Sequence, residues 1–141
     1  MYRVVILFVS SFVLSSEAYA QYSSCNDPNP DPDNPLNIIG NSYMQYIGVR
    51  KCYEAREGYQ VVYISVPELA RAREAVKALE EKALQLNPDI RKDEMWRVAN
   101  ENVDASRNPV IRDTCQYVLK MLMDSYRYHF PAKADGVEKD F

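Results

Sequence analysis

The sequence contains few of the residues that most often carry chemistry. Its 141 residues include one histidine, three cysteines, one tryptophan and four glycines. So few glycines exclude collagen-like repeats, and no glycine-rich phosphate-binding loop is present. The formal charge of −3 argues against a nucleic-acid partner, because nucleic-acid-binding proteins normally carry a basic excess. With 47% hydrophobic residues, the chain has enough apolar material for one folded domain.

Long hydrophobic runs are also scarce, and the clearest one lies at the N-terminus. Residues 4–14 are apolar apart from two serines, Arg3 precedes them, and a small-x-small sequence follows over residues 18–20. This pattern predicts a secretory signal peptide over residues 1–20, cleaved after Ala20. The run is too short to cross a bilayer, which needs roughly 20 residues. An uncleaved interfacial anchor is the weaker alternative.

Cleavage would leave a mature chain that begins at Gln21 and has no apolar run long enough to span a membrane. We therefore expect the protein to be exported to the periplasm, or alternatively to the extracellular medium. Lipid attachment at Cys25 is disfavoured, because Tyr22 stands where a lipoprotein signal would have an aliphatic residue.

Export changes how the three cysteines are interpreted. Disulfides persist outside the cytoplasm, and an odd number of cysteines leaves one thiol over. Cys52 lies near the end of the first predicted helix and Cys115 on the apolar stripe of the last, so we predict a disulfide between them. Cys25 is then the candidate free thiol; the alternatives are a bond to one of the other two or to a second molecule. Because no C-x-x-C motif and no zinc-type spacing occurs, we expect no metal and no cofactor.

A proline-rich leader precedes the folded part. Residues 21–35 contain four prolines within eight positions, which block helices and favour an extended backbone. Asp27, Asp31 and Asp33 alternate like calcium ligands, but the segment has no glycine and no closing glutamate. We therefore expect a solvated leader over 21–35, a helical domain over 36–131 and a flexible tail over 132–141.

Apolar residues recur at steps of three and four through four segments, which is the pattern of amphipathic helices. We predict an all-α fold, a small bundle of three long helices and one short one, stapled by one disulfide. The first helix begins at Asn34-Pro35, and Gly58 is its candidate end. Residues 59–64 favour an extended connector over a continued helix. Ser65 and Glu68 then form a capping box at the start of the second helix.

The remaining boundaries follow from the same signals. The second helix ends near residue 86, before Asn87-Pro88. Asp93 is the predicted N-cap of the short helix, which runs to about residue 103. Asn108-Pro109 repeats the start signal for the last helix, and Pro131 stops it.

Tyrosine is unusually dense in the first half of the domain. Tyrosine combines a large contact area with a polar tip, and it is enriched at binding interfaces. The candidate partner surface therefore consists of Tyr43, Tyr46, Tyr53, Tyr59 and Tyr63. Packing at the rim of the core is nevertheless the favoured interpretation of these tyrosines, because a small domain with few phenylalanines can use tyrosine there; the partner surface is the alternative.

No catalytic arrangement can be recognised. His129 has Ser125 and Asp124 beside it at one helical end, where the three side chains cannot converge as a catalytic triad does. The leading hypothesis is a non-enzymatic exported protein with an unidentified protein partner or an accessory role in the cell envelope. One alternative is a thiol-dependent redox protein or enzyme that uses Cys25. The other is a carrier of a small ligand or metal within the bundle. No particular oligomeric state is indicated.

Overall fold

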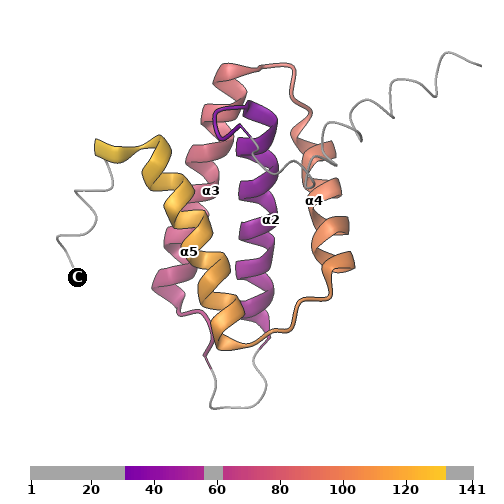
Figure 1. Cartoon of the computed structure of the whole chain (residues 1–141), viewed down its shortest axis with the longest axis vertical. Helices are drawn as coiled ribbons and strands as arrows, with labels where there is room; N and C mark the ends of the chain where they lie inside the picture. The colour runs from indigo at the N-terminus through magenta and orange to yellow at the C-terminus, as the bar shows by residue number, and fades with distance from the viewer. Residues whose placement is uncertain (1–30, 56–61, 133–141) are drawn as a thin grey trace, which may run out of the picture. The chain divides into compact units, whose positions relative to one another are not determined.

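The computed structural model describes residues 31–55 and 62–132 of the chain (Figure 1). By its internal contacts the chain divides into two units, Met1–Pro32 and Asp33–Phe141, and every described helix belongs to the second. The predicted signal peptide, most of the leader, and the tail beyond residue 132 lie outside the described residues. The helices are α2 (Pro35–Glu54), α3 (Val66–Leu86), α4 (Lys92–Ser106) and α5 (Arg112–His129).

The predicted all-α fold is confirmed. The described residues contain no strand. Helices α2, α3 and α5 have 20, 21 and 18 residues, whereas α4 has 15, so three helices are long and one is shorter.

Two of the predicted helix starts are also confirmed. The side chain of Asn34 accepts a hydrogen bond from the amide of Leu36 at 3.0 Å, and Pro35 occupies the first turn. In the capping box, the Ser65 amide donates to the Glu68 carboxylate at 2.7 Å, and the Glu68 amide donates to the Ser65 hydroxyl at 3.3 Å. These side chains satisfy amides that have no partner within their own helix.

Two other predicted starts are wrong. α4 begins at Lys92, so Asp93 lies inside its first turn rather than before it. There the carboxylate still stabilises the helix, because a helix N-terminus carries partial positive charge. α5 begins at Arg112 and not directly after Asn108-Pro109. The two residues between are β-branched and favour an extended backbone.

The connector between α2 and α3 is described only in part. α2 ends at Glu54, and its candidate stop Gly58 lies outside the described residues, as do residues 59–61 of the predicted connector. Residues 62–64 are not helical, in agreement with the prediction for that part. Ile64 is buried in the core and so fixes the entry of the chain into α3.

α2 is the central helix of the bundle. It packs against α3, α4 and α5, and α3 also packs against α5. Among the described helices α4 packs against α2 alone, and an ion pair between its first residue, Lys92, and Glu80 at 3.6 Å links it to α3. In Figure 1 it stands on the other side of α2 from α3 and α5. α4 and α5 are therefore both anchored to α2 without packing against each other.

The core lies between α2, α3 and α5. Its most deeply buried side chains come from these helices and from the connector: Ile39, Ser42, Val49, Ile64, Leu79, Cys115 and Leu122. The only polar member is satisfied locally, because the Ser42 hydroxyl donates to the carbonyl of Ile39 at 3.0 Å.

An aromatic cluster attaches α4 to α2. The ring of Trp96 meets that of Tyr43 edge to face at a centroid distance of 4.9 Å, and that of Tyr46 lies 6.3 Å away. The Tyr43 hydroxyl donates to the Glu80 carboxylate at 2.5 Å, which ties the cluster to α3. Burial, and then the negative charge of Glu80, raise the pKa of Tyr43 well above its usual range, so this phenol stays neutral.

Gly48 allows α2 and α5 to approach closely. A Cβ atom at this position would lie 3.0 Å from Cγ1 of Val118, closer than ordinary carbon contacts. Gly48 lies one turn before Cys52, which is bonded to Cys115 of the same neighbouring helix. A small residue is therefore needed where these two helices are held together.

We expect Gly48→Leu to lower the free energy of unfolding by about 2 kcal/mol, because it overpacks the contact with Val118. Gly48→Ala is the matched control. In this variant the tighter contact of the new Cβ atom with Val118 is offset by a gain in helix propensity of about 1 kcal/mol, so the free energy of unfolding changes little. Urea unfolding followed by circular dichroism measures both variants. Equal stability of the two would contradict a close approach of α2 and α5 at this point.

Candidate functional site

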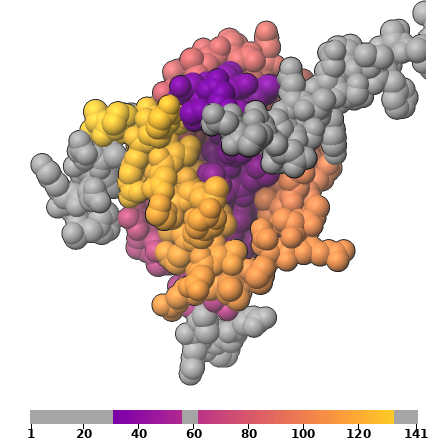
Figure 2. Space-filling model, in the orientation of Figure 1, coloured from indigo at the N-terminus to yellow at the C-terminus, as the bar shows by residue number. Residues whose placement is uncertain are grey.

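A groove lies between α4 and α5, where the surface of α2 is left uncovered. Its volume is about 520 Å³. Figure 2 shows α2, in indigo and purple, recessed between the orange and yellow surface of α5 and the orange surface of α4. The groove exists because α4 and α5 both pack against α2 but not against each other.

The floor of the groove is one face of α2. Its residues recur at helical steps of three and four, so they form a single stripe: Asn41, Met44, Gln45, Gly48, Lys51 and Cys52. At a rise of 1.5 Å per residue, this stripe is about 16 Å long, or three helical turns. At the middle of the floor, Gly48 lies against Val118 of the α5 wall.

The wall on α5 is mainly apolar, whereas the wall on α4 is mainly polar. Thr114, Val118 and Met121, also at helical spacing, form the wall on α5. The opposite wall is the end of α4, from Asn102 to Ser106. Residues 107–110, which connect α4 to α5, close one end of the groove. The charged side chains thus gather toward the connector, whereas the rest of the floor combines the apolar Met44 with the polar Asn41 and Gln45.

Three charged side chains line the groove. Lys51 and Asp104 form an ion pair across it, from α2 to α4. The third, Arg107, has no ion pair or hydrogen bond to any described residue. By contrast, Arg50, Arg97 and Arg127 pair with carboxylates on their own helices. The charged end of the groove therefore carries one uncompensated positive charge.

Arg107 also has an unusual backbone. It caps the C-terminus of α4 with φ 49° and ψ 30°, and it is the only non-glycine residue with positive φ in the described part of the chain. Glycine or asparagine is the usual choice for this conformation, which costs other residues about 1–2 kcal/mol. An arginine at such a strained position points to a role for its side chain.

We expect Arg107→Gly to raise the free energy of unfolding by about 1 kcal/mol, because glycine adopts this backbone without strain. Arg107→Ala is the control, since it removes the same guanidinium but keeps the Cβ atom and the strain. Urea titrations of the three proteins provide the comparison. A glycine variant no more stable than the alanine variant would show that position 107 is not strained.

Gln45 contributes a second unsatisfied polar group. Its Oε1 atom is buried and accepts no hydrogen bond, although the residue lies on the floor of the groove. A buried acceptor without a donor costs about 1–3 kcal/mol. If the Gln45 side chain rotated toward the groove, a ligand could donate a hydrogen bond to this oxygen and so remove that cost.

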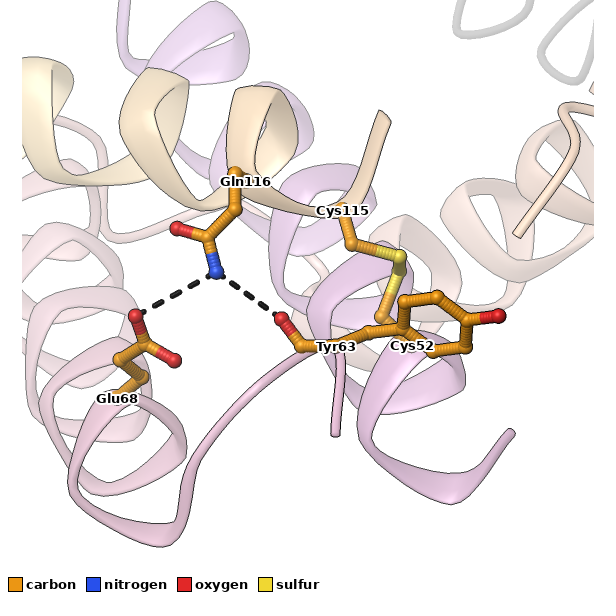
Figure 3. Close-up of a disulfide and its surroundings, with 5 residues drawn as sticks. All are labelled: Cys52, Tyr63, Glu68, Cys115 and Gln116. Carbon is orange, nitrogen blue, oxygen red and sulfur yellow. Dashed lines mark hydrogen bonds between the residues drawn. A yellow bond between two sulfur atoms is a disulfide. The ribbon is translucent and has the colours of Figure 1, made fainter. Parts of the chain in front are cut away.

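The predicted disulfide is confirmed and lies beside this floor. Cys52 is bonded to Cys115 across α2 and α5, with a Cα–Cα distance of 5.8 Å. Figure 3 shows that the next residue, Gln116, extends the connection to the start of α3. Its amide nitrogen donates to the carbonyl of Tyr63 at 3.0 Å and to the Glu68 carboxylate at 3.4 Å. The α5 wall is therefore fixed to both α2 and α3 at its N-terminal end.

Two members of the candidate tyrosine surface are buried, in agreement with packing at the core. Tyr43 and Tyr46 are only 2% and 8% exposed, because they pack against Trp96 between α2 and α4. Tyr53 and Tyr63 are half-buried, and Tyr59 lies outside the described residues. The candidate thiol, Cys25, also lies outside them.

The sequence reasoning missed the residues of the groove itself. The stripe through Met44 and Gly48 is a recognisable helical face, yet nothing in the sequence separates it from a face packed against a neighbour. The described residues include no cluster of three or more side chains suited to a metal ion. Within the same residues, no helix combines the length and apolarity that a membrane span requires.

Comparison with known proteins gives no relative. No protein-family model, no curated protein and no solved structure matches the chain.

Proposed function

We propose that this chain is an exported binding protein without catalytic activity of its own, and that its ligand occupies the groove between α4 and α5. The groove carries this proposal. Ligand sites are concave, largely apolar, about 300–1,000 Å³ in volume, and contain a few placed polar groups. The groove, at about 520 Å³, has these properties. Met44 and Met121 add flexible side chains that adapt to a ligand's shape.

Export is supported by two independent features. The first is the signal-peptide pattern over residues 1–20. The second is the Cys52–Cys115 disulfide, a bond that persists in the periplasm and outside the cell. Expression of the full chain in a bacterial host tests this part. We expect an exported protein that begins at Gln21 and contains one disulfide; an uncleaved or cytoplasmic product would contradict it.

A neutral fluorescent probe tests the groove. We expect N-phenyl-1-naphthylamine to bind the mature protein with a stoichiometry of one. Met121→Trp should abolish binding, because the indole fills the groove from the α5 wall. Gln85→Trp is the matched control, since it adds the same side chain at an exposed position of α3 that does not line the groove. Equal binding by both variants would overturn the proposal.

A protein partner is the second candidate, favoured by the outer surface of α5. Tyr117, Met121 and Tyr128 are 62%, 40% and 57% exposed, respectively. Exposed apolar side chains concentrated on one helix are typical of interaction sites. A photoreactive amino acid at position 117 tests this candidate in cells. We expect one specific adduct that Tyr128→Ala removes; adducts unaffected by that change would count against docking on this surface.

A further inference from the structure

We infer that the groove takes a small amphipathic anion, namely a free alkyl carboxylate. Its chain lies along Met44, Val118 and Met121, and its carboxylate meets the guanidinium of Arg107. This inference rests on the proposed function, since it names the chemical class of ligand for the same groove. It depends on how apolar and charged groups are distributed along the groove.

The apolar part of the groove suits an unbranched chain. Met44 on the floor and Met121 on the wall are both flexible, and Val118 lies next to Gly48, one helical turn nearer the disulfide. The floor runs for about three helical turns without a β-branched or aromatic side chain, and its polar members are Asn41, Gln45 and Lys51. A narrow, extended apolar body therefore fits this surface better than a compact one.

The charged end favours an anion. Lys51 and Asp104 neutralise each other, so Arg107 supplies the net charge of the lining. This positive end stands out in a chain whose formal charge is −3. A guanidinium forms two parallel hydrogen bonds to a carboxylate, a geometry that an ammonium group cannot reproduce. Arg107 is without a partner among the described residues, so no existing ion pair has to break when a carboxylate binds.

The position of Arg107 strengthens the argument. Its left-handed backbone belongs to the connector that closes the groove. A ligand that lies along the groove with its carboxylate at the closed end would therefore place that carboxylate beside Arg107. No hydrogen bond or ion pair of Arg107 within the described residues offsets the strain at this position, as expected if the side chain acts on a ligand.

Isothermal titration calorimetry with matched probes tests the inference. The probes are dodecanoate, dodecanol and dodecyltrimethylammonium, each below its micellar concentration, with the mature disulfide-bonded protein. We expect dodecanoate to bind with a stoichiometry of one and about tenfold more tightly than dodecanol, with the cation weakest. Arg107→Met should abolish the preference for dodecanoate over dodecanol. Arg112→Met should preserve it, because Arg112 does not line the groove.

The outcomes separate this inference from the proposed function. Equal affinity for dodecanoate and dodecanol, or an undiminished preference in Arg107→Met, would overturn the inference. Binding of the neutral fluorescent probe that Met121→Trp removes would still support the groove as the site. If neither dodecanoate nor the neutral probe binds, both proposals are wrong. Tighter binding of the cation would also overturn the inference.

Discussion

Loss of the Cys52–Cys115 disulfide is expected to lower the free energy of unfolding by about 2–5 kcal/mol. The bond joins residues 63 positions apart, so it restricts the unfolded chain strongly. It also holds α5 against α2 next to Gly48, where the two helices approach closely. Small domains have total stabilities of about 5–15 kcal/mol, so this bond supplies a large share.

Urea unfolding of the mature protein, with and without a reducing agent, measures this effect. The double variant Cys52→Ala/Cys115→Ala should match the reduced protein. Cys25→Ala is the control and should leave the midpoint unchanged. If Cys25→Ala lost as much stability as the double variant, or if reduction had no effect, the Cys52–Cys115 disulfide would not be a main source of the bundle's stability.

Trp96→Ala is expected to lower the free energy of unfolding by about 3 kcal/mol, as usual for the loss of a large packed side chain. Trp96 supplies the aromatic contacts of α4 to Tyr43 and Tyr46. α4 packs against α2 alone, and the exposed ion pair between Lys92 and Glu80 that joins it to α3 contributes little. We therefore expect α4 to detach while α2, α3 and α5 stay folded. One wall of the groove would be lost with it.

Hydrogen exchange resolved by segment distinguishes local from global unfolding. In Trp96→Ala, amides over 92–106 should exchange much faster, whereas those of α3 and α5 should keep their protection. Trp96→Phe, which retains an aromatic ring, should show a smaller effect. A uniform loss of protection in all four helices would contradict the separate attachment of α4.

Much of the fold could be predicted because its signals are local. Asn34 and the pair Ser65–Glu68 act within one helical turn, so the sequence shows them directly. The disulfide could be predicted because Cys52 and Cys115 both lie on apolar helix faces that had to meet. Asp93 failed as an N-cap because an acidic residue favours the first turn as well as the cap.

The groove could not be predicted, because it depends on which helices pack together. Tyr43 and Tyr46 share α2 with Met44 and Gln45, yet the first two face α4 and the core while the others line the groove. The sequence shows that α2 has several apolar faces but not which one stays uncovered. The left-handed backbone of Arg107 could not be predicted either, since its positive φ is set by how the connector joins α4 to α5.

The central claim is that the uncovered face of α2 between α4 and α5 is a ligand site. An NMR titration of the isotope-labelled mature protein with N-phenyl-1-naphthylamine tests it most directly. The account predicts shifts confined to amides along the groove, above all those of Gly48, Thr114, Val118 and Met121. Shifts centred on the exposed face of α3 around Gln85, or no shifts at saturating probe, would contradict it.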